Sequence, residues 1–358
     1  MKNTFGNRIH LTIFGESHGE CIGAVLDGVP AGITVDESII KSRLDMRRPQ
    51  GKISTSRIEK DEYKIVSGVL NGKTTGTPIT LLIPNTNTKS CDYDKFKTLP
   101  RPSHADYTAE VKYGGNQDSR GGGHFSGRVT AALVLAGAIL YGALREKGVV
   151  IGTHVSRLMG VCDTPMSDTD EKTLREQIAS LDSCDFPAIS PDAKKEMIEK
   201  IEKARELGDS VGGILECGIA GLPAGLGEPW FDSMESMLSH ILFSIPGVKG
   251  VEFGAGFSFS DMYGSEANDS FAVRDGRVVT LTNNNAGING GITNGMPTVF
   301  RVAVKPTPSI FKEQATVNLE KMENATVKID GRHDPAIVHR ARAVVDAATT
   351  IAIADFLL

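Results

Sequence analysis

Cysteine is scarce in this chain of 358 residues, and its positions are scattered. The five cysteines are Cys21, Cys91, Cys162, Cys184 and Cys217. An odd number without C-x-x-C spacing predicts neither a disulfide framework nor a zinc site. We therefore expect no metal and a reducing, cytoplasmic location.

Long apolar segments and targeting signals are lacking as well. The longest apolar run, Val129–Leu144, contains two glycines and is too short to span a bilayer, so it predicts a buried helix. The start of the chain, MKNTFGNRIH, has neither the apolar stretch of a signal peptide nor the arginine- and serine-rich character of a transit peptide. We expect no membrane partner and no segment preceding the mature fold.

Positive charge is in short supply overall but not at the start of the chain. The formal net charge is −5, which argues against nucleic acid as a partner. Residues 1–130 carry 18 Lys and Arg against 14 Asp and Glu, a net charge of +4, so the remainder carries −9. A basic first third can focus positive potential on an anionic ligand. A chance imbalance of solvated surface charge is the alternative.

No short-period repeat and no proline- or serine-rich linker divides the chain, so one large domain over residues 1–358 is expected. Alternation of apolar and polar residues predicts strands at Arg8–Phe14, Lys64–Leu70, Pro78–Ile83, Gly212–Ile219, Val248–Phe257, Arg277–Thr282 and Pro297–Val304. Helices are inserted irregularly between paired strands, which favours the α+β class over a doubly wound parallel sheet. The charged stretch 163–210 predicts a helical insertion that caps one end.

Apolar stripes and end signals predict further helices. They lie in the stretches DESIIKSRLDMRRP, SPDAKKEMIEKIEKAREL, DSMESMLSHILFSIPG and DPAIVHRARAVVDAATTIAIADFLL. In the last stretch, Asp334 is expected to cap the helix and Pro335 to occupy its first turn.

Two histidines stand on irregular segments. In FGESHGE, Gly15 and Gly19 are expected to present Ser17 and His18 on a tight turn that a ligand can approach. For one histidine alone, a partly exposed ring satisfied by its neighbours is the preferred interpretation. A second histidine, His104 in RPSHADYT, has Asp106 nearby to orient its ring, and two such residues suit two proton transfers.

Glycine and arginine together suggest an anion site. In DSRGGGHFSGRVT, three glycines before a helix can expose N–H groups to a phosphate, with Ser126 and Arg128 as added donors, although neither a Walker A nor a G-x-G-x-x-G pattern is present. Arginines flank the glycine and proline turns at Arg47, Arg48, Arg57, Arg101, Arg120, Arg128 and Arg332. Guanidinium groups match phosphates and carboxylates bidentately, so a small polyanionic ligand is expected.

Eight motifs taken in order resemble the chorismate synthase family over nearly the whole chain. They are FGESHG with IGAVLDGVPAG, MRRPQGK, TTGTPI, RPSHADYT, RGGGHFSGR, GITNG, VKPTPS and GRHDP. The resemblance implies a β-α-β sandwich and a homotetramer that binds reduced FMN. It implies a lyase that converts 5-enolpyruvylshikimate 3-phosphate to chorismate and phosphate by 1,4-anti elimination, without net redox change. This is the last common step of aromatic amino-acid biosynthesis, at the end of the shikimate pathway.

The resemblance also implies roles for individual residues. His18 would protonate the departing phosphate, His104 would protonate the reduced flavin, and Asp334 would act with the flavin to remove the ring proton. Ser17 and Ser126 would assist Asp334. Flavin contacts are implied at His124, Phe125, Ser126, Pro246, Gly247, Gly290, Lys305, Pro306, Thr307, Pro308, Ser309 and Arg332, and substrate contacts at Arg47, Arg48, Arg57, Arg101 and Arg128.

Two stretches depart from the pattern that many members of the family share. His124-Phe125 and Pro246-Gly247 replace residues that contact the flavin elsewhere, so backbone contacts are expected there rather than side-chain ones. Two other functions remain open: a flavin oxidoreductase that consumes NADPH, and a protein that binds an anion without catalysis. Reduction of the flavin by NADPH on this chain and reduction by an external flavin reductase are equally open.

Overall fold

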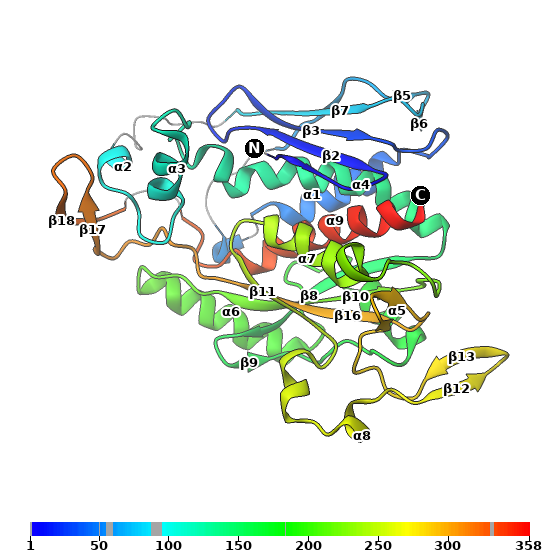
Figure 1. Cartoon of the computed structure of the whole chain (residues 1–358). Coiled ribbons are helices and arrows are strands. Elements are labelled where there is room, and N and C mark those ends of the chain that lie inside the picture. Colours follow the sequence, from blue (N-terminus) through cyan, green and yellow to red (C-terminus); the bar gives the residue numbers. More distant parts are fainter. Residues whose placement is uncertain (1, 50, 55–59, 87–94, 183, 330–332) are drawn as a thin grey trace.

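Two five-stranded antiparallel sheets enclose a layer of helices (Figure 1). The computed structural model describes residues 2–49, 51–54, 60–86, 95–182, 184–329 and 333–358. Seen from the side, the first sheet lies above the helices and the second lies below them (Figure 1). The chain therefore has the α+β class that its sequence pattern predicts and the β-α-β sandwich that the resemblance implies.

The first sheet is built from the amino-terminal part of the chain. Its strand order is β1 (Thr4–Phe5), β2 (His10–Gly15), β3 (Cys21–Asp27), β7 (Ile79–Pro84) and β4 (Lys64–Ile65). Alternate residues of β7 (Ile79, Leu81 and Ile83) are fully buried, as expected for a sheet with one face on a core. Beside it lies a short hairpin of β5 (Val69–Leu70) and β6 (Lys73–Thr74).

The second sheet is covered on both faces. Its order is β11 (Val248–Phe253), β16 (Thr298–Val304), β10 (Gly213–Ala220), β8 (Val150–Leu158) and β9 (Val161–Cys162). The outer face is covered by α5 (Glu171–Leu181), whose Ile178 and Leu174 pack over Gly152 and Gly218. With α6 (Pro191–Glu206), this helix forms the predicted helical stretch; α5 covers a sheet face, whereas α6 contacts the edge strand β9.

The helical layer consists of α1 (Glu37–Arg47), α4 (Thr130–Glu146), α7 (Met234–Ser244) and α9 (Val338–Leu357). Helix α4 packs on the first sheet and α9 on the second, and the two helices contact each other closely at Gly137 and Ala347. In the described part of the chain, the helical stretch Gly127–Glu146 has the length and hydropathy of a membrane span. It is therefore longer than the apolar run Val129–Leu144 on which the prediction is based. It is 83% buried in the sandwich, as predicted for a core helix.

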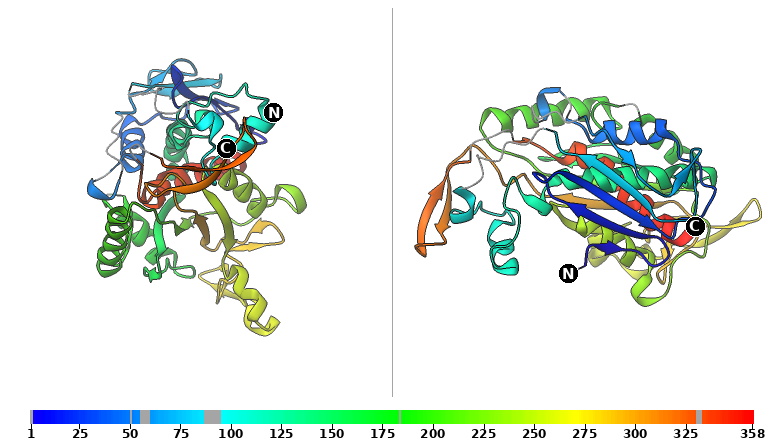
Figure 2. Two further views of the ribbon diagram at one scale, coloured as in Figure 1. Left: turned by 90° about the vertical axis from the view of Figure 1, so that its left-hand side faces the viewer. Right: turned by 90° about the horizontal axis from the view of Figure 1, so that it is seen from above.

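Smaller elements project from the two ends of the sandwich (Figure 2). At one end lie α2 (Lys95–Thr98), α3 (Asp106–Tyr113) and the hairpin of β17 (Gln314–Asn318) with β18 (Glu323–Val327). Phe96, Val327 and Ile329 form a small core of their own there. Toward the other end lie α8 (Gly264–Ala267), the hairpin of β12 (Phe271–Arg274) with β13 (Arg277–Thr280), and the hairpin of β14 (Ile288–Asn289) with β15 (Ile292–Thr293).

Several element boundaries differ from the sequence-based expectation. The predicted strand Lys64–Leu70 is divided by Gly68, which has a φ of +80°. The strand predicted to reach Phe257 ends at Phe253, before two glycines with φ of +55°, and β13 ends at Thr280 rather than Thr282. Helix α9 begins at Val338, so Asp334 is not its cap.

Candidate active site

The segment that follows β2 folds inward. Ser17 Oγ lies 3.1 Å from His18 Nδ1 and donates a hydrogen bond to the Arg120 carbonyl oxygen at 3.3 Å. The Ser17 N–H donates to the carbonyl oxygen of Gly123 at 3.0 Å. The Ser17 and His18 side chains are 1% and 6% exposed, so the expectation of an openly presented turn is wrong. Gly121 of the chain itself lies close against the His18 ring.

Residues Gly121–Arg128, called here the glycine segment, join this turn to the start of α4. A Cβ built on Gly121 would lie 2.2 Å from His18 Nδ1, and the φ of Gly121 is +69°. The N–H groups of Gly122 and Gly123 donate to Arg120 O at 2.8 and 3.0 Å. These two donors therefore point into the chain, and the expected exposed phosphate cradle is not formed by them.

The side chains of the glycine segment have structural partners. The His124 Nδ1–H donates to Gly15 O at 2.8 Å, which ties the segment to the end of β2. Phe125 is 39% exposed, and its ring centroid lies 6.2 Å from that of Tyr113. Ser126 Oγ accepts the Arg128 N–H at 3.2 Å. His124 is therefore a link between strand and loop, whereas Phe125 remains accessible.

His104 lies against the same segment, held by a carboxylate. Its Nδ1 is 2.7 Å from Asp106 Oδ1, as the sequence predicts, and its Nε2 faces Gly122. Arg101 binds both Asp106 oxygens at 2.7 Å and donates to Gly121 O at 3.2 Å. Burial disfavours the charge of Asp106, but hydrogen bonds from Arg101 and His104 outweigh it and hold the pKa of that carboxyl well below its usual range.

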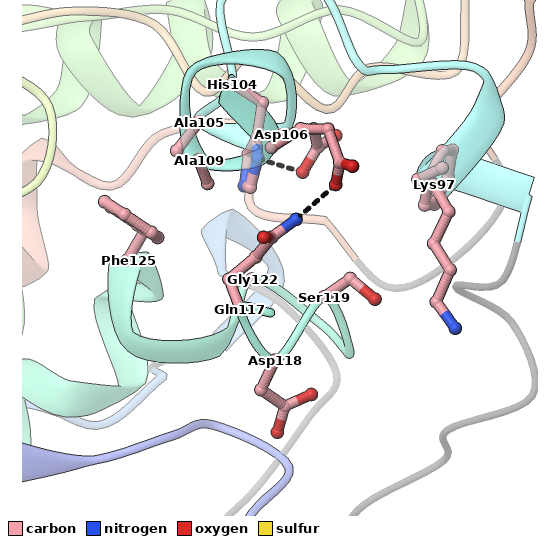
Figure 3. A pocket seen from close by; sticks show the side chains of 12 residues that line it. Lys97, His104, Ala105, Asp106, Ala109, Gln117, Asp118, Ser119, Gly122 and Phe125 are labelled. Carbon is pink, nitrogen blue, oxygen red and sulfur yellow. Dashed lines mark hydrogen bonds and ion pairs between the residues drawn. The ribbon is translucent and has the colours of Figure 1, made fainter. Parts of the chain in front are cut away.

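A pocket lies beside His104 (Figure 3). His104, Gly122 and Phe125 line it together with residues of α3 and the loop after it. Figure 3 shows the His104–Asp106 contact next to a second pair, in which Gln117 Nε2 donates to Glu110 Oε2 at 2.7 Å. The pocket thus gives the His104 ring and the glycine segment one common concave surface.

Arg47 and Arg128 converge on one carboxylate that sequence reasoning missed. Arg47 Nη1 lies 3.3 Å from Asp61 Oδ2, and Arg128 Nη1 contacts Asp61 Oδ1. Arg47 also donates from Nε to Thr130 Oγ1 at 3.1 Å and from Nη2 to Gly127 O at 2.9 Å. Asp61 is 4% exposed, so one buried carboxylate is shared by two guanidinium groups and balances one of their two charges. Two arginines that lie buried side by side require a nearby carboxylate, and this requirement could have indicated Asp61.

Arg48 and Arg101 also pair with carboxylates of the chain. Arg48 contacts Asp45 and the carbonyl oxygen of Lys60, and its side chain is 32% exposed. Arg101 is 4% exposed, and its guanidinium stacks over the Phe96 ring at 4.7 Å. Arg57 and Arg332 lie outside the described residues. All four described arginines of the predicted substrate set therefore have an acidic partner within the chain.

The predicted flavin residues at Pro246–Gly247 and Lys305–Ser309 lie next to one another. The Lys305 N–H donates to Gly247 O at 2.9 Å, and Lys305 Nζ donates to Ser103 O at 2.6 Å. Burial, with a contribution from Lys249, lowers the pKa of Lys305. Ser210 Oγ donates to Thr307 O at 2.6 Å, while the buried Thr307 Oγ1 has no hydrogen-bond partner among the described residues. This stretch is therefore tied to the His104 loop.

Asp334 is linked to the glycine segment indirectly, through Arg340 and Arg47. Its Oδ2 lies 2.7 Å from Nη1 of Arg340, and Arg340 Nε donates to Arg47 O at 2.8 Å. The next residue, Pro335, accepts the Val211 N–H at 2.8 Å, beside Ser210. Asp334 is thus connected both to Arg47 and to the Lys305–Ser309 stretch. Arg340 is a further site residue that sequence reasoning missed.

Gly290 does not join this cluster within one chain. It stands in the β14–β15 hairpin, where Gly291 O accepts the Met234 N–H at 2.9 Å. That hairpin precedes the Thr298 end of β16, whereas Lys305 follows the Val304 end. Seven strand residues separate these ends by roughly 20 Å. Among the remaining described candidates, Arg47, Ser126 and Arg128 lie at the start of α4, and Lys305 is tied to the His104 loop.

No group of three or more His, Cys, Asp or Glu side chains in the described part of the chain is arranged to hold a metal ion. Fold and side chains together define the class: an α+β sandwich protein with a histidine- and arginine-rich site at the start of its central helix. A crystal structure of a chorismate synthase superimposes with a TM-score of 0.77 and 29% sequence identity, over 99% of this chain and 92% of that one.

The sequence comparisons identify the family. The family model for chorismate synthase matches residues 9–358. The chorismate synthase of Thermococcus gammatolerans is 46% identical over 358 residues, which cover 99% of this chain and 97% of the relative. That of Dehalococcoides mccartyi is 46% identical over 360 residues, covering 100% and 97%, and that of Methanosarcina mazei is 45% identical over 357 residues, covering 99% and 96%. The chain belongs to the chorismate synthase family, whose members are enzymes of the shikimate pathway.

Proposed function

We propose that this protein converts 5-enolpyruvylshikimate 3-phosphate to chorismate and phosphate by 1,4-anti elimination, with reduced FMN and no net redox change. One observation carries the proposal. Ser17 and His18, and His104, come from distant stretches of a family member and approach the glycine segment, which contains Ser126, and Asp334 is linked to that segment through Arg340 and Arg47. This linked set supplies proton donors and an acceptor, as an elimination of phosphate requires.

His18 would protonate the departing phosphate. Ser17 Oγ beside Nδ1 and the backbone of Gly121 fix the orientation of the ring. When the carbon–oxygen bond breaks, its electron pair leaves with the phosphate, and a proton from the imidazole neutralises the new charge. An imidazole is suited to this exchange because it titrates near neutral pH.

Asp334 would accept the ring proton, so that one proton and one phosphate leave the substrate for each new double bond. Arg340 holds the carboxylate at 2.7 Å. Ser126 lies next to Gly127, whose carbonyl oxygen accepts from Arg47, and Arg47 in turn contacts Arg340. A hydroxyl at this position can donate a hydrogen bond to the carboxylate or to the substrate.

The residues of the site fit a flavin phosphate and ring. Thr307 Oγ1 is a buried hydroxyl without a partner among the described residues, Lys305 adds a cation, and Pro246–Gly247 and Phe125 add apolar surface. Reduced FMN would supply the electron-rich ring that assists expulsion of the allylic phosphate. His104, fixed by Asp106, would hold a proton toward that ring. His124, Ser126, Pro306, Pro308, Ser309 and Arg332 complete the proposed flavin contacts of this chain, and Gly290 would contribute its contact from another copy of the chain.

The proposed substrate residues are Arg47, Arg48, Arg57, Arg101 and Arg128. Arg47 uses Nε, Nη1 and Nη2 on Thr130, Asp61 and Gly127, so a contact with substrate would replace one of these bonds. Carboxylate partners hold such guanidinium groups in one orientation before the ligand arrives, which reduces the entropy lost on binding. The positive charge of the first third of the chain would attract the anionic substrate.

We further propose a cytoplasmic homotetramer. The β12–β13 hairpin exposes 67% of Phe271, 75% of Val273 and 63% of Val278, and Phe271 and Val273 are alternate residues of one strand, so they share a face. A two-stranded hairpin with an uncovered apolar face is marginal alone and is stabilised by a partner surface. Another copy of the chain would supply that surface. NADPH bound to this enzyme and an external flavin reductase are the two candidate sources of electrons for FMN.

An anaerobic assay tests the proposed function. The protein is mixed with dithionite-reduced FMN and the substrate, and chorismate, phosphate and the flavin spectrum are followed together; NADPH is then added in a second reaction. We expect chorismate and phosphate in equal amounts and no NADPH consumed per turnover. Stoichiometric consumption of NADPH would instead indicate an oxidoreductase, and binding without turnover would indicate an anion-binding protein.

A further inference from the structure

We propose that Arg340 is a positioning residue that holds the carboxylate of Asp334 in its working orientation. The inference rests on the proposed function, in which Asp334 accepts the ring proton. It assigns to α9, otherwise a buried core helix, a direct part in building the site.

The conformation around Asp334 shows why such a residue is needed. The aspartate precedes α9 by four residues and does not cap it, since Ile337 stands at the cap position without a side-chain hydrogen bond. The orientation of the Asp334 carboxylate is therefore not fixed by helix geometry. The Arg340 guanidinium supplies a direct constraint, with Nη1 at 2.7 Å from Oδ2 and both side chains largely buried, at 17% and 13% exposure.

Arg340 is itself held at a second point. Its Nε donates at 2.8 Å to the carbonyl oxygen of Arg47, the last residue of α1. Arg47 donates to Gly127 O and to Thr130 Oγ1 at the start of α4. A continuous set of hydrogen bonds thus runs from Asp334 to the residue after Ser126. It fixes the carboxylate relative to the glycine segment, against which His18 lies.

The position of Arg340 in the helix supports a role beyond packing. Arg340 is the third residue of α9, near the positive end of the helix dipole, where a cation is disfavoured. The nearby carboxylate of Asp334 offsets this cost. A lysine could not reproduce the arrangement, because a single ammonium group cannot approach both partners in the fixed directions of a guanidinium fork.

A double-mutant cycle tests whether Arg340 acts through Asp334. The variants are Arg340→Gln, Asp334→Asn and their combination, assayed anaerobically with reduced FMN. We expect Arg340→Gln to lower kcat roughly tenfold to a hundredfold, with KM and the FMN dissociation constant changed less than about threefold. Because the two residues act as a unit, adding Arg340→Gln to Asp334→Asn should lower kcat by less than about threefold more.

Two further variants separate positioning from folding. Arg340→Lys keeps the charge, and we expect its kcat to lie between those of the wild type and Arg340→Gln; it serves as the readout if Arg340→Gln does not fold. Arg175→Gln breaks a comparable arginine–carboxylate contact, 2.6 Å from Glu171 on α5, and should leave kcat unchanged. Thermal unfolding of all variants shows which losses reflect stability.

The outcomes distinguish this inference from the proposed function. A wild-type protein that forms no chorismate overturns the proposed function, and the inference with it. With an active wild type, the inference alone is overturned by multiplicative losses in the double variant or by an unchanged kcat in Arg340→Gln. Full activity of Asp334→Asn would overturn both the inference and the proposed role of Asp334 as proton acceptor. A loss that follows unfolding in both Arg340 variants also overturns the inference.

Discussion

Gly121 and His18 lie so close together that a Cβ built on the glycine would be 2.2 Å from Nδ1 of the imidazole. The same Cβ would be 2.8 Å from Ser17 Oγ. Only glycine can therefore stand at position 121 without displacing the proposed acid. The backbone at this position is also left-handed, with a φ of +69°, which glycine adopts without strain.

Gly121→Ala should lower turnover by displacing His18. Since a misplacement of about 1 Å can cost roughly a hundredfold in rate, we expect a loss of roughly tenfold to a hundredfold in kcat. Steady-state kinetics under argon measure it. Gly142→Ala is the matched control, because a Cβ at this position of α4 would lie 3.6 Å from Ile39 Cδ1 and 3.9 Å from Thr34 O, which are ordinary contacts, so activity should be kept. Full activity in Gly121→Ala would show that the reaction does not depend on Gly121.

Removal of either imidazole should affect rate much more than fold. We expect His18→Ala and His104→Ala each to lower kcat roughly 10²–10⁴-fold, the usual contribution of a general acid. Phosphate release measures the rate, and circular dichroism checks the fold. A variant with full turnover would exclude its histidine from proton transfer.

Asp106 should make the stability contributed by the His104 loop depend on pH. Its pKa lies below the ordinary value, so the stability it contributes is present above about pH 4, the unfolded value, and is lost as pH falls through the folded value. Asp106→Asn should therefore be less stable than the wild type at pH 6, and this difference should shrink below pH 4. Denaturant unfolding at several pH values measures it. A difference that does not depend on pH would contradict the ion-pair account.

His154 should give the second sheet the opposite pH dependence. Its ring is fully buried, 2.7 Å from Asp163 and 3.0 Å from Glu216. Burial lowers the pKa of His154, but the hydrogen bonds and charges of the two carboxylates outweigh it and raise the pKa. The resulting stability is full below about pH 6.5 and is lost as pH rises through the folded value, by at most about 1.4 kcal/mol per pH unit.

The control for this prediction is His154→Asn. This variant should unfold more easily at pH 6, because Asp163 and Glu216 would be left without their cation. Its stability should also no longer fall as the pH rises. Breaking a buried pair costs roughly 3 kcal/mol or more. Urea unfolding between pH 6 and 9 is the measurement. If the wild type were as stable at pH 9 as at pH 6, His154 would not be charged in the folded protein.

The apolar hairpin should matter for assembly. Val273→Glu places a charge on its exposed face, and we expect the tetramer to dissociate into smaller species because a buried charge without a partner is costly. Met322→Glu is the matched control, since Met322 is 84% exposed in the turn between β17 and β18. Light scattering on both variants measures the mass. A tetramer in both cases would place the interface elsewhere.

The elements with local end signals could be predicted from sequence. Asp36 caps α1 by accepting the Ser38 N–H at 2.8 Å, and the apolar run after Val129 is the buried α4. Asp334 has the same local pattern as a cap, followed by Pro335, yet the prediction is wrong there. A carboxylate can bind a helix N–H or a side chain six residues away, and local sequence does not distinguish Arg340 from a solvent-exposed arginine.

The site residues could be selected from sequence, but their pairing could not. The motifs placed His18, His104 and Asp334 in the candidate set; the structure places the two histidines against the glycine segment and links Asp334 to it through Arg340 and Arg47. Asp61 escaped notice because its role depends on two arginines from other elements. The arginines were expected to face a ligand, whereas those described pair with acids of the chain. Contacts between segments distant in sequence decide which group each arginine pairs with, and the periodicity of apolar residues does not reveal these contacts.

The most direct test is a turnover count with limiting flavin. Reduced FMN is supplied anaerobically at one tenth of the substrate concentration, and chorismate, phosphate and flavin absorbance are recorded in the same cuvette. The account predicts that all of the substrate yields chorismate and phosphate in equal amounts while the flavin ends reduced. Product limited to one equivalent per flavin, with the flavin oxidised, would contradict an elimination without net redox change.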